Sequence, residues 1–275
     1  MKSNTELQLI AYKIRRHAIV GVYNAASGHP GGSLSIADIL SVLYFDEMNV
    51  NPSNPSNPDR DRFVLSKGHA APVLYSALAR KGFFPAEELA TLRKFGSRLQ
   101  GHPFTGTIPE VDATTGLLGQ GLSVAVGMAI AKRNNGDNHH VYAIVGDGEM
   151  QEGQIWESLL QAAHYKLNNL ILVIDYNKLS SYSDVNESIN LEPLANKVRA
   201  FNFHTLEIDG HDMEQIVNAL NEAYQVTDKP IAIICNTVKG KGISYMENNP
   251  KWHTGLISDE EYKTALQDLE KAEVE

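Results

Sequence analysis

The chain has 275 residues, and 24 Lys and Arg against 33 Asp and Glu give it a formal net charge of −9. This acidic balance argues against nucleic acid or an anionic membrane as a partner, since both attract basic surfaces. A single cysteine excludes an intrachain disulfide. The longest aliphatic runs are too short to span a bilayer; they lie at residues 170–174 and 231–235. We therefore expect a globular protein of the cytoplasm.

The first elements along the chain are expected to be helices. Residues 5–26 carry apolar side chains at helical spacing, and the Gly- and Pro-rich residues 27–32 end this helix. A second helix is predicted to begin at Ser35, with Asp38 as its capping-box partner. Residues 51–58, with a proline at every third position, favour an extended surface crossing.

The rest of the chain alternates between strands and helices. Strands are predicted at residues 63–65, 141–145, 170–175, 203–208 and 231–238. Helices are predicted after His69, at 154–165 and 213–225, and after a Ser258–Glu261 capping box. Helical crossovers between strands predict an α/β fold with a mostly parallel sheet covered on both faces. We expect residues 1–275 to form one domain.

The Gly146-Asp147-Gly148 turn carries the sharpest chemical signal. Asp147 follows one predicted strand, and Asn177 follows the next. Since ligands of open α/β sheets bind at the carboxyl ends of strands, the carboxylate and amide oxygens are expected to meet at one edge. Such oxygen ligands suit Mg²⁺. The alternative is a tight turn in which Asp147 is a capping residue and Asn177 forms an Asx turn.

Two other glycine-rich turns give weaker signals. The pattern Gly116-Leu117-Leu118-Gly119-Gln-Gly121 does not follow a strand, as a dinucleotide-binding fingerprint must. The turn around Lys241, Gly240-Lys-Gly242, offers a cation that either meets a phosphate or is simply solvated.

Four histidines lie in loops or at their edges, beside glycine or proline or at a chain reversal: His29, His69, His102 and His253. Each by itself is more readily structural, but together they indicate a shared polar pocket suited to binding hydroxyls and moving protons. A zinc hydrolase is the rival interpretation. It is weakened because no His-x-His or His-Glu-x-x-His spacing occurs.

These motifs resemble transketolase. The resemblance runs from about residue 5 to 255 and rests on five stretches in the same order. They are residues 26–32 (Ala-Ser-Gly-His-Pro-Gly-Gly), 59–69 (ending Ser-Lys-Gly-His), 101–103 (Gly-His-Pro), 114–121 and 146–153. Only the pyrophosphate-binding half of that enzyme is represented. The resemblance therefore implies the N-terminal subunit of a split transketolase, whose C-terminal subunit is a separate chain, with two copies of each chain expected.

The resemblance also implies a cofactor site for thiamine diphosphate and Mg²⁺. Asp147, Asn177 and the carbonyl of Leu179 would hold the cation, and Gly148 would contact the diphosphate. His69 and His253 would approach the cofactor, and residues 116–118 (Gly116, Leu117 and Leu118) would line its rings. Glu152 matches a family glutamate at the subunit interface and receives no direct role.

The implied reaction transfers a two-carbon ketol unit from a ketose phosphate to an aldose phosphate, with the cofactor as electron sink. His29, His102 and His253 would bind the ketose. The glutamate that activates the cofactor belongs to the other half of the family enzyme. The segment Ser180-Ser-Tyr182-Ser-Asp184 departs from the family pattern and lacks glycine. Tyr182 and Asp184 are therefore expected to alter the pocket wall and the choice of ketose.

Two alternatives remain open at this point. One is another thiamine diphosphate enzyme, related to deoxyxylulose-phosphate synthase or to the α subunit of a 2-oxo acid dehydrogenase. The histidine set favours sugars over oxo acids. The other is a non-catalytic subunit that has kept the fold, which the intact Asp147 and Asn177 pair disfavours.

Overall fold

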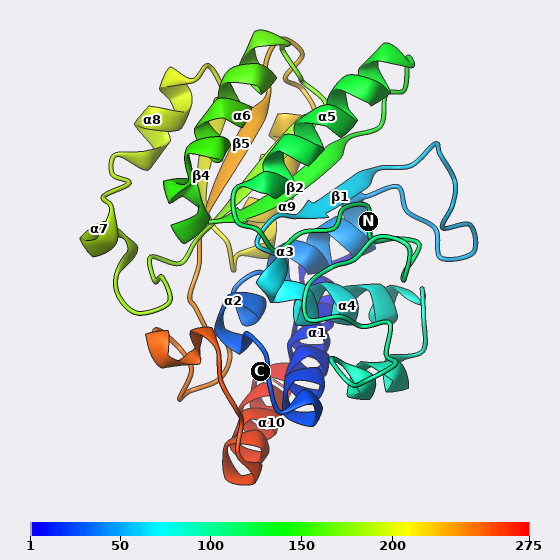
Figure 1. Ribbon diagram of the computed structural model, residues 1–275, viewed down its shortest axis with the longest axis vertical. Coiled ribbons are helices and arrows are strands. Elements are labelled where there is room, and N and C mark those ends of the chain that lie inside the picture. The colour runs from blue at the N-terminus through cyan, green and yellow to red at the C-terminus, as the bar shows by residue number, and fades with distance from the viewer. Residues whose placement is uncertain (1, 275) are drawn as a thin grey trace.

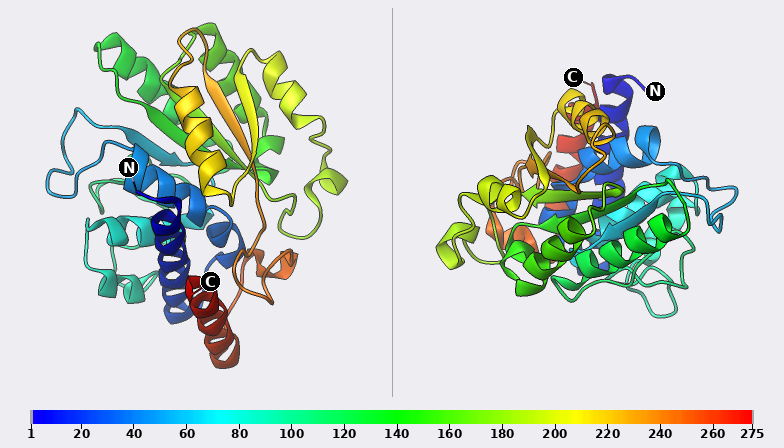
Figure 2. Two further views of the ribbon diagram at one scale, coloured as in Figure 1. Left: turned by 180° about the vertical axis from the view of Figure 1, so that it is seen from behind. Right: turned by 90° about the horizontal axis from the view of Figure 1, so that it is seen from above.

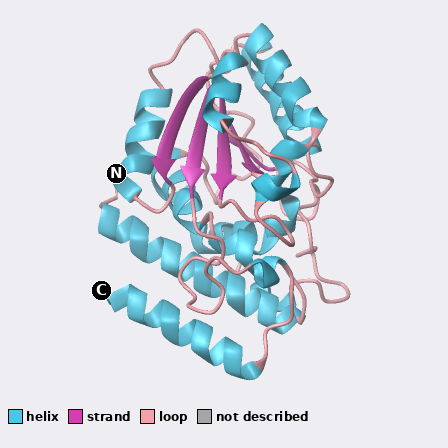
Figure 3. Cartoon of the chain, turned by 90° about the vertical axis from the view of Figure 1, so that its left-hand side faces the viewer, coloured by secondary structure: helices cyan, strands magenta, loops and turns pink. Residues whose placement is uncertain are grey.

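The computed structural model describes residues 2–274 (Figure 1). The strands within them form one five-stranded parallel sheet in the order β1-β2-β3-β5-β4. Their bounds are β1 Arg62–Leu65, β2 Val141–Gly146, β3 Leu170–Tyr176, β4 His204–Asp209 and β5 Ile231–Asn236. All strand arrows point to the same edge of the sheet in Figure 3. The predicted α/β fold with a parallel sheet is confirmed.

Helices cover both faces of the sheet, as Figure 2 shows from above. The core on one face includes α5 (Gln120–Asn134), α6 (Gly153–His164) and α8 (Leu194–Ala200). The core on the other face includes α3 (Ala37–Val42), α4 (Ala71–Lys81) and α9 (Met213–Ala223), together with α1 (Asn4–Ala25).

The strands supply apolar side chains to both cores, because consecutive residues of a strand point to opposite faces. Val141, Ala143 and Val145 of β2 belong to the α5 and α6 side. Tyr142 and Ile144 belong to the α3 and α9 side. Every residue of β2 and β3 is buried, which is the pattern of a parallel sheet covered on both faces.

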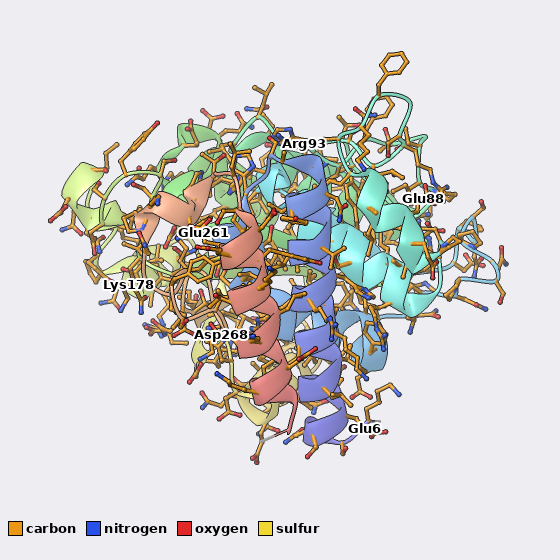
Figure 4. The ribbon with its side chains drawn as sticks, turned by 90° about the horizontal axis from the view of Figure 1, so that it is seen from below. Glu6, Glu88, Arg93, Lys178, Glu261 and Asp268 are labelled. Atoms are coloured by element: carbon orange, nitrogen blue, oxygen red, sulfur yellow. The ribbon has the colours of Figure 1, made fainter. Side chains whose placement is uncertain are left out.

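A third apolar core joins the two ends of the chain. The C-terminal helix α10 (Asp259–Val274) lies beside α1, as Figure 4 shows. Ala265 and Leu269 of α10 pack with Ile19 and Val22 of α1. The predicted capping box is present, since the Glu261 amide donates to Ser258 Oγ and the Ser258 amide donates to the Glu261 carboxylate.

The predicted start of the second helix at Ser35 is wrong. Residues 30–42 form two short helices, α2 (Pro30–Leu34) and α3, and Ile36 precedes α3 without a side-chain cap. The Asp38 carboxylate is buried and accepts from Arg15 Nη1 at 3.0 Å. The Ser35 hydroxyl donates to Asp175 at 2.8 Å. Both side chains that a capping box would use therefore bind residues that are distant in the sequence.

One further expectation is wrong, and one helix is absent from the sequence prediction. Residues 51–58 form successive turns rather than an extended crossing, since the Asn54 and Asn57 amides donate to carbonyls three residues before them. Helix α5 was not predicted. From residue 121 to 131 every residue except Ser123 is apolar or glycine, so the helix lacks the one-sided apolar stripe that marks a surface helix.

Short helical turns complete the described structure. They are the helix α7 (Val185–Ser188), the π-helical turn Leu43–Glu47, and the 3-10 turns Gly68–Ala70, Ala86–Thr91, Gly148–Gln151 and Pro250–His253. Within residues 2–274, no helix combines the length and the apolar character that a bilayer crossing requires.

Candidate functional site

Asp147 and Asn177 meet at the carboxyl edge of the sheet, as their spacing predicts. Each follows one of the neighbouring strands β2 and β3, in which Gly146 pairs with Asp175. Asp147 Oδ2 accepts from the amide of Lys178 at 2.5 Å, and Asn177 Oδ1 accepts from the amide of Leu179 at 3.1 Å. Two consecutive backbone N–H groups thus hold the two side-chain oxygens on the same turn.

This donor set fits Mg²⁺, which prefers carboxylate, amide and carbonyl oxygens. Asp147 and Asn177 are both nearly buried, and the Leu179 carbonyl lies on the same turn. A Cβ built on Gly148 would meet no atom within 4 Å, so the position beside Asp147 is open. The Gly148 N–H donates to Asp147 Oδ1 at 2.7 Å. In the described part of the chain, no group of three or more His, Cys, Asp or Glu is arranged for a metal.

A cavity of about 390 Å³ opens above this turn. It gathers residues from every loop at the carboxyl edge of β1, β2 and β3, together with the loop after β5. Its lining includes His29, Gly32, Lys67, His69, Gly116, Leu118, Asp147, Gly148, Glu152, Asn177, Leu179, Ser180, Ser181, Lys239 and His253. Most of the predicted site residues therefore share one pocket.

Two buried lysines place ammonium groups in the lining of the cavity. Lys67 Nζ donates to the Gly32 carbonyl and to Asp175 Oδ2, each at 2.6 Å. Lys239 Nζ donates to the carbonyls of Leu179 and Ser180, each at 2.8 Å. Both lysines are 2% exposed. A diphosphate in this cavity would face two ammonium groups as well as the oxygen ligands.

Burial and neighbouring charges shift the pKa values of the charged groups at this turn. Burial, reinforced by the nearby Asp175 carboxylate, raises the pKa of Asp147 to about 7. Burial lowers the pKa of Lys239 to about 8, although the Asp147 carboxylate opposes the change. A bound divalent cation would favour the ionised form of Asp147.

Three of the four histidines form one cluster. The ring centroid of His69 lies 5.1 Å from those of both His29 and His253, and His29 and His253 are 5.5 Å apart. His102 stands at the edge, 6.4 Å from His29, and lines a neighbouring cavity instead. The Nδ1 atom of His29 is buried and has no hydrogen-bond partner, so it is available to a ligand.

The histidines in the cluster are neutral at pH 7. Burial, followed by the Arg93 charge, lowers the pKa of His29 to about 4. Burial and the Lys239 ammonium lower the pKa of His253 to about 4. Burial and Lys67 hold the pKa of His69 well below its usual value. Neutral imidazoles can both donate and accept hydrogen bonds, as binding of sugar hydroxyls requires.

One buried carboxylate ties the glycine-rich loop to the rest of the site. Glu149 accepts from Ser66 Oγ at 2.5 Å, from the Gly119 amide at 2.9 Å and from the Gly146 amide at 3.2 Å. Gly116 has φ +144°, and a Cβ there would lie 2.9 Å from the His102 ring. The loop that carries residues 116–118 is thereby fixed against the strand ends.

The structure places three further expected side chains outside the cavity. Tyr182 is 93% exposed, and Asp184 caps α7 by accepting from the Asn186 amide; neither lines the cavity, which Ser180 and Ser181 line instead. Leu117 is 80% exposed and also lies outside the lining. Of the two interpretations left open for Lys241, the structure agrees with the solvated one, since its side chain is 38% exposed beside Glu247. Lys239, two residues earlier, lines the cavity instead.

Sequence reasoning missed the buried groups that support the site, namely Lys67, Glu149, Asp175 and Lys239. Lys67 and Glu149 lie within two of the transketolase-like stretches, directly beside Gly68 and Gly148. A charged residue next to a glycine at a strand end is the signal that could have found them. Asp175 lies inside an apolar strand, and a charge there requires a buried partner.

The fold and the site together define the class of protein. At the carboxyl edge of a parallel sheet, side-chain oxygens of the kind that divalent cations prefer share one cavity with two buried lysines and a group of histidines. This arrangement fits an α/β protein that binds an organic diphosphate together with a metal ion.

Comparison with known proteins identifies the family. The chain matches the family described as "Transketolase, thiamine diphosphate binding domain" over residues 7–271. It belongs to the transketolase family, and the matched domain is one that binds thiamine diphosphate. The resemblance drawn from the sequence motifs is confirmed.

Curated relatives match the chain from end to end. It is 45% identical to "6-deoxy-6-sulfo-D-fructose transketolase subunit SqwG" of Clostridium sp. (strain MSTE9), over 97% of each chain. It is 42% identical to one of the subunits of the apulose-4-phosphate transketolase of Phocaeicola vulgatus, over 96% of this chain and 93% of that one. Both relatives are named as subunits, which implies a partner chain.

Solved structures agree with the fold. The transketolase of Campylobacter jejuni superimposes with a TM-score of 0.91 at 37% identity, covering 98% of this chain and 43% of that chain. The transketolase of Pichia stipitis in complex with sedoheptulose 7-phosphate gives a TM-score of 0.91 at 32% identity, covering 98% of this chain and 41% of that chain. The chain thus spans less than half the length of the solved transketolases that it matches.

Proposed function

We propose that this chain is the cofactor-binding subunit of a split transketolase, which transfers a two-carbon ketol unit from a ketose phosphate to an aldose phosphate. The observation that carries the proposal is one cavity in which Asp147 and Asn177 oxygens lie beneath a cluster of neutral histidines. The names and full-length match of the curated relatives support it.

The cation and the diphosphate are assigned to the turns at the strand ends. Asp147, Asn177 and the Leu179 carbonyl hold Mg²⁺, and the Gly148 amide and Lys239 contact the diphosphate. The chemistry of the donor set and the burial of Lys239 support these roles. When bound, thiamine diphosphate supplies an electron sink for cleavage of a carbon–carbon bond.

The histidines are assigned to the ketose. His69 and His253 also face the cofactor, while His29, His102 and His253 bind hydroxyl and carbonyl oxygens and hold or move protons at their ring nitrogens. The unpartnered Nδ1 of His29 and the lowered histidine pKa values support this role. Gly116 and Leu118, which line the cavity, are assigned to the rings of the cofactor.

The substrate is proposed to be a ketose with an anionic end group. The names of the two relatives specify a sulfonated fructose and apulose 4-phosphate, both of which carry such a group. Ser180 and Ser181 line the cavity where the sequence departs from the family pattern, so they are proposed to influence which ketose is accepted.

The assembly is proposed to contain two copies of this chain and two of a C-terminal transketolase subunit, which supplies the remainder of the active site. One match over residues 7–271 supports the view that residues 1–275 are a single domain. We further propose that the complex works in the cytoplasm, where sugar phosphates are metabolised.

The test is reconstitution of activity from the two chains. With thiamine diphosphate and Mg²⁺, the complex of this chain and its partner should transfer ketol units from a ketose phosphate, and the purified chain should not. Full turnover by this chain without a second polypeptide would contradict the split arrangement. A panel of ketose phosphates, sulfonated ketoses and pyruvate would separate a transketolase from an oxo-acid enzyme.

A further inference from the structure

Asp175 is a buried carboxylate directly behind the cation site. It belongs to β3, two residues before Asn177, and is 0% exposed. Its Oδ2 atom accepts from Lys67 Nζ at 2.6 Å, Ser35 Oγ at 2.8 Å and Asn177 Nδ2 at 2.9 Å. Its Oδ1 atom accepts from the Thr237 hydroxyl.

The other contacts of Asp175 show that its Oδ2 atom is an acceptor. Lys67 Nζ can only donate a hydrogen bond, so Oδ2 accepts at that contact. The side of the Asn177 amide that faces it must therefore be the NH₂ group.

A second contact selects the same orientation of the amide. The Leu179 amide, which can only donate, faces Asn177 Oδ1 at 3.1 Å. An amide side chain presents oxygen on one side and NH₂ on the other, and only the oxygen can bind a hard cation. The orientation of Asn177 thus decides whether the turn beside Asp147 offers a ligand or a repelling N–H group.

We infer that Asp175 is a positioning residue that fixes the amide of Asn177 so that its oxygen, rather than its nitrogen, is presented to the bound cation. The inference rests on the proposed assignment of Asn177 as a metal ligand. It goes beyond that assignment because Asp175 itself needs no contact with the cation. Partners of this kind orient the ligands of many metal sites.

Two substitutions separate the hydrogen bond from the charge of Asp175. Asp175→Asn removes the charge but keeps a hydrogen-bond acceptor. The amide oxygen of the new Asn can replace Oδ2 and accept from the same three donors. Its NH₂ group then replaces Oδ1 and donates to the Thr237 hydroxyl, which can turn to accept. Asp175→Leu removes both the charge and the acceptor. Ser35→Ala is the matched control, since it removes a different hydrogen bond to Oδ2 and leaves that of Asn177 intact.

The quantity measured is the affinity for the cation, in the complex with the partner chain and at saturating thiamine diphosphate. Electron paramagnetic resonance follows a titration with Mn²⁺, and competition with Mg²⁺ gives the affinity for that ion. We expect Asp175→Leu to weaken the affinity about 10- to 100-fold. Asp175→Asn and Ser35→Ala should stay close to the parent protein. Circular dichroism and thermal unfolding report whether each variant is folded.

The outcomes distinguish the possible roles of Asp175. Equal losses in the Asn and Leu variants would overturn the inference in favour of a purely electrostatic role, and no loss in either would also overturn it. If Asp175→Leu fails to fold, the Asp175→Asn and Asp175→Leu substitutions are compared in a Lys67→Met variant. That variant lacks the Lys67 ammonium, which would otherwise be buried without its carboxylate partner. A parent complex that binds no cation would instead refute the metal site itself.

Discussion

At the scale of single residues, burial controls the chemistry of this site. Asp147, Lys239 and the histidines all lie where water is largely excluded, so their pKa values move toward the neutral form. An ion of opposite charge beside Asp147 or Lys239 would favour the charged form of that side chain. Binding of the proposed cation and diphosphate is therefore expected to be coupled to the protonation of these two groups.

The Asp147 carboxylate is expected to be the main attraction for the cation. Asp147→Ala removes the only charged ligand proposed for Mg²⁺ and should abolish metal-dependent binding of thiamine diphosphate in the assembled enzyme. Isothermal titration calorimetry with and without Mg²⁺ measures this. An unchanged Mg²⁺-dependent affinity would count against the assignment.

Two neighbouring lysines provide a controlled test of the diphosphate contact. Lys239→Met should weaken thiamine diphosphate binding roughly 10- to 100-fold, since a buried charge-assisted hydrogen bond contributes about 1.5–3 kcal/mol. Lys241→Met should leave binding unchanged, because Lys241 is half-exposed and pairs with Glu247. Fluorescence quenching titrations can compare them. Equal losses would place the diphosphate elsewhere.

The histidine pKa values predict an unusual pH dependence. His29 and His253 have pKa values of about 4, so they remain neutral as the pH falls from 8 to 5. With thiamine diphosphate and Mg²⁺ saturating, the KM for a sulfonated ketose, whose own charge is constant in this range, should therefore show no change near pH 6.5, where an ordinary histidine gains a proton. Protonation of these two imidazoles should weaken binding only as the pH approaches 4. A KM that rises as the pH falls through 6.5 would show that these imidazoles are not shielded.

At the scale of elements, the site is formed by loops that follow the strands at one edge of the sheet. Glu149 connects the loops after β1 and β2 to the loop that begins α5. Lys239 connects the turn after β3 to the segment after β5. The segment after β5 is in turn held by the third core, in which its residues Ile243 and Trp252 pack with α1 and α10.

Truncation of a leucine in this third core should reduce stability. Leu269→Ala empties a site that is 2% exposed and is expected to lower the free energy of unfolding by about 2–5 kcal/mol. Leu256→Ala is the control, because Leu256 is 67% exposed and should change stability by less than about 0.5 kcal/mol. Urea unfolding followed by circular dichroism measures both. Equal effects would mean that α10 is not packed as described.

At the scale of the whole molecule, ligand binding should be visible as added stability. Thiamine diphosphate and Mg²⁺ at about 100 times the dissociation constant should stabilise the native complex by about 2.7 kcal/mol, because they bind only the folded state. Differential scanning fluorimetry should show a higher melting temperature, and Asp147→Ala should remove the increase. No increase in the parent complex would favour a non-catalytic subunit.

Much of this architecture was predictable from the sequence because it depends on local pattern. The buried strands β2, β3 and β5 are runs of aliphatic residues, and the helices between them fix a parallel sheet. Asp147 and Asn177 could be placed together because parallel strands end at one edge. The Ser258–Glu261 capping box needs only four residues of sequence.

The tertiary structure alone decided which polar side chains are buried and what they contact. Ser35 and Asp38 have the spacing of a capping box, yet their partners are Asp175 and Arg15, which are remote in sequence. Lys239 and Lys241 both lie beside Gly240 in the sequence, but only Lys239 lines the cavity. Spacing along the chain determines which strand ends come together, whereas burial and long-range partners, which spacing does not encode, determine the charge state and orientation of each group there.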